Sequence, residues 1–572
     1  MTEGEATRGF LDTAAATFLA RRLHHQRVRA AAMGEREGQA TSRRPHTAED
    51  VPPLSIVVMT VGSRGDVQPF IPIGRRLAER HRVRIATHGV FRSMVEGAGL
   101  EFYPLAGDPT VLMDYMLRSG GHILNPRRLD RVLVDAPRQR ALVAEILAST
   151  WRACTEPDPE RPGDPPFKTE LIIANPPSFG HIHCAEALGV PLHMIFTMPC
   201  SPTTVYPHPF AGLDSGQSQP LENYLSYGAV DLVIWVGIHD LVNAFRRDAL
   251  GLPPLSLVEG PGMLEDHAVP FTYLWPDALV PRPADWPPHV ELANFTFYDM
   301  GHGYRPPAAL AEFLAGGEAP IYVGFGSVLV EDPAAVARTI FSALEKSGAR
   351  GVVSEGWAHL RGGTPPPNVF LIGDIPHDWL FPRCRAVCHH GGAGTTSAGL
   401  RAGLPTVVVP SFGDQFFWGR VVADAGAGPD PIPITGLNTA ALTAAFDACR
   451  RPQVRERAQA LGARLREIDG AELVVQSVYR WLPVEAMRCA IHPDRVATIE
   501  CVACGQLRLC PECVPEHAAH LTRPCRYVSW DVHPDLGLVA ELGDLVGDAA
   551  TALQAGFDEL VSKTASRATH SG

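Results

Sequence analysis

The sequence predicts an α/β protein with two doubly wound, Rossmann-like domains and a small Cys/His-rich module near its C-terminus. Short apolar runs rich in β-branched residues alternate with helical patterns in both halves of the chain, which is typical of parallel sheets covered by helices. A glycine-rich turn follows one such run in each half. Six of the twelve cysteines fall between Cys489 and Cys525. A chain of 572 residues is long enough for two or three domains.

These patterns divide the chain into six expected segments. They are a disordered segment (1–50), a first Rossmann-like domain (51–275), an interdomain linker (276–319), a second Rossmann-like domain (320–483), a Cys/His-rich module (484–530) and a helical tail (531–572). The linker is predicted from the prolines between 276 and 288, which favour a semi-rigid connection.

The first domain opens with a continuous apolar run at 54–60, as expected of a strand buried on both faces. A turn over 61–69 and a helix over 70–79 follow it. We also expect strands at 83–87, 171–174 and 192–196 and a helix at 91–98. Ligands of open α/β sheets bind at the carboxyl ends of the strands, so the turn that contains Gly62 and Asp66 predicts a binding crevice.

The second domain repeats this alternation. After a first strand within 320–327, we expect strands at 351–354, 369–372, 386–388 and 406–409 and helices at 333–347, 395–402, 416–425 and 439–450. The glycine-rich turn after Cys388 exposes backbone N–H groups at a helix N-terminus, where an anionic phosphate is favoured. His389 and His390 add further donors. Two open sheets that face one another place a cleft between them, which we expect to be the functional site.

Composition excludes some classes of protein. The net charge of −12 argues against a nucleic-acid partner, which requires a basic surface. No apolar run approaches the roughly 20 residues needed to cross a bilayer, and the candidate at 229–238 is short and contains Asp231. Clustered cysteines and histidines suggest metal binding rather than disulfides, and so a reducing compartment. We therefore expect a cytoplasmic protein whose contact with membranes is at most transient.

The stretch 198–255 is rich in aromatic side chains and has two interpretations. The aromatic residues of this stretch are Tyr206, Phe210, Tyr224, Tyr227, Trp235 and Phe245. They could belong to helices packed on the first sheet, or they could line an apolar acceptor pocket.

Five motifs in order carry a resemblance to a known family. They lie at 62–69, 324–327, 376–380, 389–396 and 412–420. Residues 54–483 resemble the inverting, nucleotide-sugar-dependent glycosyltransferases of the two-Rossmann (GT-B) fold, and among them the sterol 3-beta-glucosyltransferase group. The resemblance implies UDP-glucose as the donor and a lipid-like acceptor, in particular a sterol. It also implies that the first domain binds the acceptor and the second the UDP-sugar.

The resemblance assigns a general base to Asp66. A hydroxyl acceptor loses its proton as it attacks the anomeric carbon, so a base must lie within hydrogen-bond reach. Plant relatives have a histidine at the matching place, so a carboxylate here needs a pKa raised by burial. The alternative is that Asp66 only caps the helix that begins near Pro69.

The same resemblance implies a UDP-sugar site and no catalytic metal. The expected contacts are Ser63, Arg64, Asp66, Gly326, Ser327, Ile375, His377, His390, Gly392, Ala393, Gly394, Thr395, Asp414 and Gln415. Backbone amides and His390 would stabilise the leaving diphosphate, and Asp414 with Gln415 would bind glucose hydroxyls. Asp414 could instead be a helix cap, and His389 could face the core. In the plant small-molecule enzymes that the chain resembles, the place of Asp374 carries a tryptophan that stacks on uracil. Trp357 and Trp379 are therefore the candidates here for contact with the uracil ring.

Four pairs of potential metal ligands follow residue 483. They are Cys489 and His492, Cys501 and Cys504, Cys510 and Cys513, and His517 and His520. Eight such ligands suit two tetrahedral structural zinc ions. The pattern resembles a B-box-type zinc finger with interleaved sites, one from the first and third pairs and one from the second and fourth. A disulfide framework is the alternative, and Cys525 and His533 are spare ligands. Such modules bind partner proteins, so we expect a protein partner.

Two rival functions fit parts of these patterns. One is a natural-product glycosyltransferase that acts on a macrocycle or a glycopeptide. The other is a zinc-finger interaction protein whose transferase half is inactive. The presence of Asp66, His390, Asp414 and Gln415 together argues against the second rival.

Overall fold

The structure is a computed structural model. It describes residues 46–111, 129–213, 216, 218–257, 259–326, 332–355, 364–517, 520–528 and 530, with backbone alone for 129–137. The predicted helical tail (531–572) and nearly all of the predicted disordered segment (1–50) therefore lie outside the described residues.

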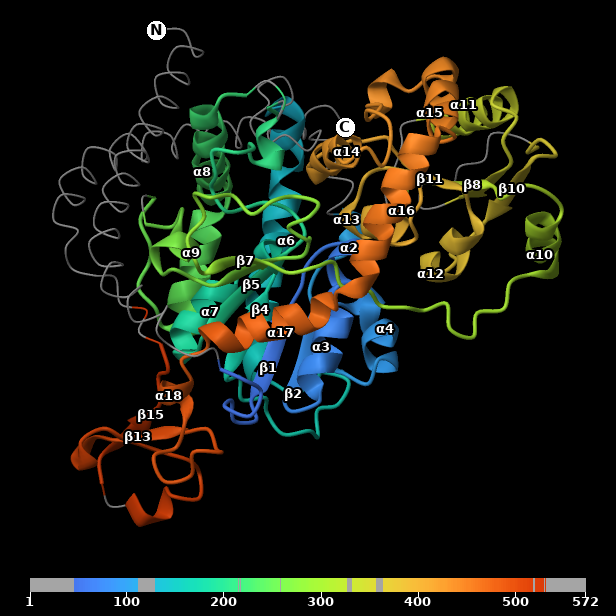
Figure 1. The fold of residues 1–572 in the computed structure, drawn as a ribbon. Helices are drawn as coiled ribbons and strands as arrows, with labels where there is room; N and C mark the ends of the chain where they lie inside the picture. The colour runs from blue at the N-terminus through green and yellow to red at the C-terminus, as the bar shows by residue number, and fades with distance from the viewer. Residues whose placement is uncertain are drawn as a thin grey trace, which may run out of the picture.

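A seven-stranded parallel sheet forms the first domain (Figure 1). In spatial order its strands are β3 (Glu101–Leu105), β2 (Arg82–His88), β1 (Ser55–Met59), β4 (Leu171–Ala174), β5 (Leu192–Phe196), β6 (Phe271–Tyr273) and β7 (Val290–Leu292). The central strand β1 is buried on both faces, as its apolar run predicts. The helices that pack around it are α3 (Phe70–Ala78), α4 (Arg92–Gly97), α6 (Leu129–Thr155) and α7 (His181–Leu188).

The first sheet reaches into the segment expected to be a linker. β7 lies inside 276–319, and its residues Val290 to Leu292 pair with β6. Strands of three residues are too short to show an alternating pattern, which is why β6 and β7 are missing from the expectations. The sheet therefore continues past the expected boundary at 275.

A five-stranded parallel sheet forms the second domain. In spatial order its strands are β10 (Val369–Ile372), β9 (Gly351–Ser354), β8 (Ile321–Gly324), β11 (Ala386–His389) and β12 (Thr406–Val408). Its main helices are α11 (Pro333–Lys346), α13 (Ala393–Arg401), α14 (Asp414–Asp424) and α15 (Thr439–Ala448). The helices α13 and α14 begin two residues earlier than expected, directly after Gly392 and Gly413. The first turn of each helix therefore faces the cleft.

The end of the second domain returns to the first. Helix α16 (Pro452–Glu467) runs back, and α17 (Gly470–Trp481) packs along α3 (Figure 1). The hydroxyls of Ser477 and Thr272 are 2.8 Å apart, which ties α17 to β6. The Asn294 amide donates to the carbonyls of Leu465 and Ile468 at 3.1 and 3.0 Å. Residues 470–481 therefore belong in space to the first domain.

Helix α8 (Pro220–Phe245) is much longer than the apolar run 229–238 suggested. With its extension to Leu250 it is the one helix among the described residues that is long and apolar enough, by length and composition only, to cross a membrane. In the fold it packs along α6, and the side chains of Trp235 and Phe245 are buried. The sequence indicated only the run 229–238, because polar residues such as Asp231 and Asp240 interrupt the apolar sequence of this helix.

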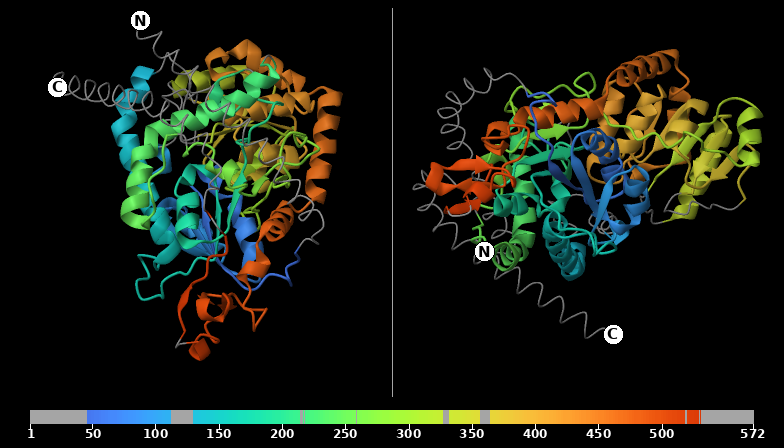
Figure 2. Two further views of the ribbon diagram at one scale, coloured as in Figure 1. Left: turned by 90° about the vertical axis from the view of Figure 1, so that its left-hand side faces the viewer. Right: turned by 90° about the horizontal axis from the view of Figure 1, so that it is seen from below.

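The Cys/His-rich module lies at the end of the first domain that is far from the second sheet (Figures 1 and 2). It follows the short helix α18 (Val484–Met487). Its antiparallel sheet has three strands of three residues each, β13 (Ile499–Cys501), β14 (Leu507–Leu509) and β15 (Thr522–Pro524).

The return of the chain from the second domain to the first, through α16 and α17, suggests a stability test. Asn294 is fully buried and its side chain makes three backbone hydrogen bonds, the third from the N–H of Phe295. The substitution Asn294→Ala should lower the free energy of unfolding by about 1–3 kcal/mol, because it leaves buried backbone groups without partners. Asn368→Ala is the control, since Asn368 is half-buried and its amide donates to one carbonyl. Equal losses in urea unfolding would contradict this role for Asn294.

Candidate functional site

A large cavity separates the two domains. Its volume is about 3090 Å³, and both domains contribute to its lining. From the first domain come the turn after β1, residues after β4 and β5, and much of α8; from the second come residues 372–378, His390 and the first turns of α13 and α14. The carboxyl ends of both sheets thus meet here, as the doubly wound pattern predicts.

The turn after β1 places Asp66 at this cavity. Asp66 lies in the short helix α2 (Arg64–Val67). Its Oδ2 accepts hydrogen bonds from the backbone N–H and the hydroxyl of Ser63, at 2.7 and 3.1 Å. A Cβ atom at Gly62, whose φ is +139°, would lie 2.4 Å from that oxygen, so this position requires glycine. Asp66 therefore does cap a helix, but the helix is α2 rather than the one near Pro69.

Two residues that the sequence analysis missed hold the turn. The Asn175 side chain accepts from the N–H of Val61 at 3.0 Å and donates to its carbonyl at 2.8 Å. Nε2 of His88 accepts from the N–H of Gly62 at 3.2 Å, while Nδ1 donates to the carbonyl of Ala106. Burial lowers the pKa of His88, which favours this neutral form. Asn175 directly follows β4 and His88 is the last residue of β2, so their place at the carboxyl edge of the sheet was the signal that could have identified them.

The glycine-rich turn after β11 forms a cradle at the N-terminus of α13. Gly392 is the N-cap residue, so the N–H groups of the first turn are available to an anion. Nδ1 of His390 is buried without a hydrogen-bond partner, and burial lowers the pKa of this histidine to about 4. A neutral His390 with an unpartnered ring nitrogen fits a phosphate oxygen as its missing partner. A Cβ at Gly394 would lie 3.7 Å from the Cα of Gly65, so the turn of the first domain faces this cradle.

His389 has a structural role. It is fully buried, and its Nδ1 accepts from the N–H of Gly391 at 3.0 Å. His389 therefore faces the core, as the alternative in the sequence analysis states.

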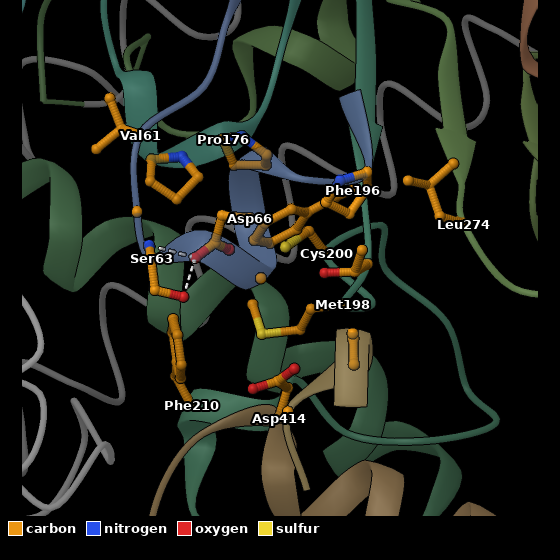
Figure 3. Close-up of a pocket in the computed structure, with 18 of the residues that line it drawn as sticks. Val61, Ser63, Asp66, Pro176, Phe196, Met198, Cys200, Phe210, Leu274 and Asp414 are labelled. Atoms are coloured by element: carbon orange, nitrogen blue, oxygen red, sulfur yellow. Dashed lines mark hydrogen bonds between the residues drawn. The ribbon is translucent and has the colours of Figure 1, made fainter. Parts of the chain in front are cut away.

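Asp414 enters the cavity from the second domain, opposite Asp66 (Figure 3). It is the first residue of α14, directly after the N-cap residue Gly413. Burial raises the pKa of Asp414 to about 7, and the nearby charge of Asp66 contributes. Burial also raises the pKa of Asp66 to about 6. The two carboxylates therefore interact electrostatically across the cleft.

Gln415 supports the neighbouring loop. Its Oε1 accepts from the N–H groups of Ser411 and Phe412, at 2.8 and 3.3 Å. The side chain is 3% exposed, although the residue lines the cavity. Its carbonyl oxygen is thus already in use, and only its amide nitrogen could serve a sugar hydroxyl.

At the end of the cavity where uracil is expected, Ile375 and His377 both contribute to the lining. The Arg64 side chain pairs with the facing domain, where its Nη1 is 2.7 Å from Oδ2 of Asp374. The ring of His377 stacks on Phe381 at 4.3 Å, and Ile375 is nearly buried beside it. Trp379 stacks with Arg383 and does not line the cavity. Gly326 lies against the His390 ring, whereas Ser327 and Trp357 fall outside the described residues.

The part of the cavity in the first domain is mainly apolar. Figure 3 shows Phe196, Met198, Phe210 and Leu274 around Asp66. Of the six aromatic residues between 198 and 255, Phe210, Tyr224 and Trp235 line the cavity, whereas Tyr206, Tyr227 and Phe245 pack in the interior. Part of this stretch therefore packs in the core of the first domain, and part lines the apolar region of the cavity.

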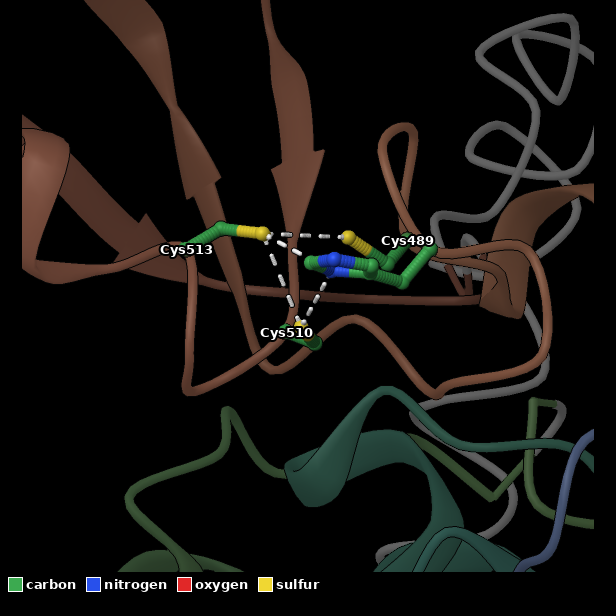
Figure 4. Close-up of side chains that lie close together, drawn as sticks. Cys489, Cys510 and Cys513 are labelled. Atoms are coloured by element: carbon green, nitrogen blue, oxygen red, sulfur yellow. Dashed lines mark hydrogen bonds between the residues drawn. The ribbon is translucent and has the colours of Figure 1, made fainter.

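The module brings its cysteines and histidines into two groups. They are Cys489, His492, Cys510 and Cys513, and Cys501, Cys504, His517 and His520, and the ligand atoms of each group lie within 4.8 Å of one another. The Cys513 sulfur lies 3.8 Å from that of Cys489 and 3.7 Å from that of Cys510 (Figure 4). Tetrahedral zinc with Zn–S bonds of about 2.3 Å separates its sulfur ligands by about 3.8 Å. The side chains thus gather in the two interleaved groups that could each hold a metal ion, and all twelve cysteines are described and free of disulfides.

Comparison with known proteins agrees with this fold. Residues 56–207 match the glycosyltransferase family 28 N-terminal domain, and residues 358–469 match the erythromycin biosynthesis protein CIII-like C-terminal domain. Two sterol 3-beta-glucosyltransferases of Arabidopsis thaliana are each 43% identical to the chain, over 435 and 438 residues. These matches cover 76% of this chain and 66% and 69% of the relatives. The chain belongs to the sterol 3-beta-glucosyltransferase family.

This family member spans about two thirds of the length of those plant relatives. Among solved structures, the kitacinnamycin glycotransferase superimposes with a TM-score of 0.52 at 20% identity, over 74% of this chain and 99% of that one. The match confirms the predicted GT-B fold.

The bonds of Asn175 lead to a prediction about the site. Asn175→Leu keeps the volume but removes both bonds to Val61, so the turn that carries Asp66 should shift. Since a displacement of about 1 Å at a reacting group costs about 100-fold, the turnover number for sugar transfer should fall at least about tenfold. The control is Asn243→Leu, because Asn243 makes the same two bonds to Leu255 away from the cavity. Similar turnover in the two variants would contradict the positioning role.

Proposed function

We propose that the protein transfers glucose from UDP-glucose to the hydroxyl of a lipid-like acceptor, a sterol 3-beta-hydroxyl, with inversion at the anomeric carbon. The observation that carries this proposal is the placement of Asp66 and Asp414 on opposite walls of one cavity. The phosphate cradle at the start of α13 and the apolar side chains near Asp66 line the same cavity. The names of the plant relatives support a sterol as the acceptor.

The proposed reaction needs one base and no catalytic metal. Asp66 takes the proton of the acceptor hydroxyl as its oxygen bonds to the anomeric carbon. The bond from that carbon to the phosphate oxygen breaks, and its electron pair leaves with UDP. His390 and the N–H groups of α13 stabilise the charge that develops on the diphosphate. Asp414 holds a glucose hydroxyl.

A base whose pKa lies near the working pH suits this chemistry. The raised pKa of Asp66, about 6, makes it a stronger base than an exposed carboxylate while it is still ionised at neutral pH. If Asp66 served only as a helix cap, its carboxylate would not need to be buried. The arrangement therefore favours an active transferase over the rival in which the transferase half is inactive.

The base role predicts a pH dependence. A carboxylate base is active when deprotonated, so kcat/KM should fall as the pH decreases through about 6 to 7, the range given by the pKa values of Asp66 and Asp414. Asp66→Asn should retain UDP binding and lose at least about 100-fold in kcat, with no acid limb of this kind. Unchanged turnover in Asp66→Asn would overturn the base role. Transfer from labelled UDP-glucose and calorimetric titration of UDP provide the two measurements.

The acceptor is tested with a panel. Ergosterol and cholesterol should accept glucose, whereas soluble macrocycles and glycopeptides should accept little, because the pocket around Asp66 is apolar. Transfer to a macrocycle with none to either sterol would replace the sterol assignment by the natural-product alternative.

We infer further that the two Cys/His groups hold two structural zinc ions, with no open coordination position. Eight ligands with tetrahedral spacing and free thiols support this. Such thiols persist in a reducing compartment, which favours the cytoplasm. A protein partner of the module remains part of this proposal.

The zinc proposal predicts a metal count. The purified protein should contain about two zinc ions per chain by elemental analysis. Cys510→Ser and Cys504→Ser should each reduce the count by about one, because each removes a ligand from a different group. Cys449→Ser, outside both groups, should leave the count unchanged. Fewer than one zinc per wild-type chain would contradict the two-site proposal.

A further inference from the structure

The module has almost no apolar core of its own. Its buried cluster consists of Cys489, Cys501, Leu509, Cys510 and Cys513, and four of these five residues are proposed metal ligands. Its three strands have three residues each. A sheet of this size is not stable by itself, so bound metal would supply much of its folding free energy.

The module is attached to the first domain at both ends. On the entry side, Val484 and Met487 of α18 are buried in the main hydrophobic cluster, which includes the strands of the first domain. On the exit side, directly after β15, Cys525, Tyr527 and Trp530 are buried in the same cluster. A module that only recruited another protein would not require its exit segment to be buried in the transferase.

The exit segment, residues 525–528 and 530, binds the end of helix α7. The N–H of Tyr527 donates to the carbonyl of Gly189 at 2.7 Å, and Nη2 of Arg526 donates to the carbonyl of Glu186 at 2.6 Å. Gly189 has a φ of +66°, and a Cβ atom there would lie 2.7 Å from Cγ of Arg526. The two segments are therefore in close contact.

Helix α7 is also a wall of the cavity. His181, Ile182 and His183 at its start line the cavity. At its end, the Glu186 carboxylate pairs with the buried guanidinium of Arg246, at 2.6 and 3.1 Å, and Arg246 directly follows α8. The exit segment thus contacts Glu186, whose carboxylate links α7 to the end of α8. Much of α8 in turn lines the apolar part of the cavity.

A second contact reaches another part of the wall. The rings of Trp530 and His267 lie 5.1 Å apart, and Trp530 is 7% exposed. His267 follows the short helix α9 (Met263–Asp266), all four residues of which line the cavity. Two consecutive parts of the exit segment therefore touch two walls of the apolar half of the cavity.

From these contacts we propose that the metal-held module braces α7 and α9, and that this brace strengthens binding of the lipid-like acceptor without affecting the UDP-sugar. The acceptor part rests on the proposed function, whereas the brace itself does not. The UDP-sugar cradle lies on the second domain, which none of the contacts described above involves.

The test compares two arginines of the module. Arg526→Ala removes the bond to Glu186 from an exposed position, so the fold should survive. Arg523→Ala is the matched control, because Arg523 is also exposed but pairs with Glu500 inside the module. Each variant, and wild-type protein before and after zinc removal with phenanthroline, is studied by amide hydrogen exchange. Binding of UDP and of the fluorescent sterol dehydroergosterol is measured in parallel, with zinc content as a check.

The brace predicts that Arg526→Ala keeps two zinc ions and wild-type affinity for UDP. Its amides at 181–189 should exchange about five times faster, and its affinity for dehydroergosterol should fall about threefold. Arg523→Ala should match the wild type. Zinc removal should accelerate exchange at both 181–189 and 263–267, and added zinc should reverse it.

Unchanged exchange at 181–189 in Arg526→Ala, or at both segments after zinc removal, would overturn the brace. An equal loss of affinity for UDP would also overturn it, because it would indicate general destabilisation. If dehydroergosterol fails to bind even the wild type, the sterol assignment is wrong, while the exchange data still decide whether the brace exists.

Discussion

The interaction on which the site depends is the meeting of Asp66 and Asp414, two carboxylates from different domains, in one cavity. Burial raises the pKa of both, and the charge of Asp66 raises that of Asp414 further. Such a pair persists only where the surrounding structure fixes its members. Asn175 and His88 fix the turn of Asp66, and the glycine-capped start of α14 fixes Asp414. The packing of α17 on α3 then holds the two domains in register.

Much of this arrangement could be predicted from the sequence, because its elements carry strong local signals. The strands β4, β5, β9 and β10 occupy the predicted residues, since each is a short run of apolar residues between turns. The interleaved metal groups also agree, because their ligand spacing permits few pairings. The three-residue strands β6 and β7 and the long helix α8 were missed. They owe their structure to tertiary packing, and α8 is apolar on most of its circumference rather than along one stripe.

The position of the candidate site residues was predictable from the sequence, but the contacts that support them were not. Asp66, His390 and Asp414 follow strands or begin helices, and this places them at the edge where ligands bind. The partner of Arg64 was not predictable, since Asp374 lies 310 residues away in the other domain. An exposed ion pair of this kind contributes little to stability, so it does not prevent the domains from adjusting to a nucleotide.

The central claim is that Asp66 delivers the acceptor oxygen to the face of the sugar opposite the diphosphate. Proton NMR of the steroid glucoside formed from UDP-glucose and ergosterol tests this claim most directly, because it reports the configuration of the new bond. UDP-glucose is α-linked, so a single displacement assisted by Asp66 predicts a β-glucoside. An α-glucoside would contradict the account, because it would require retention and therefore a different role for the two carboxylates.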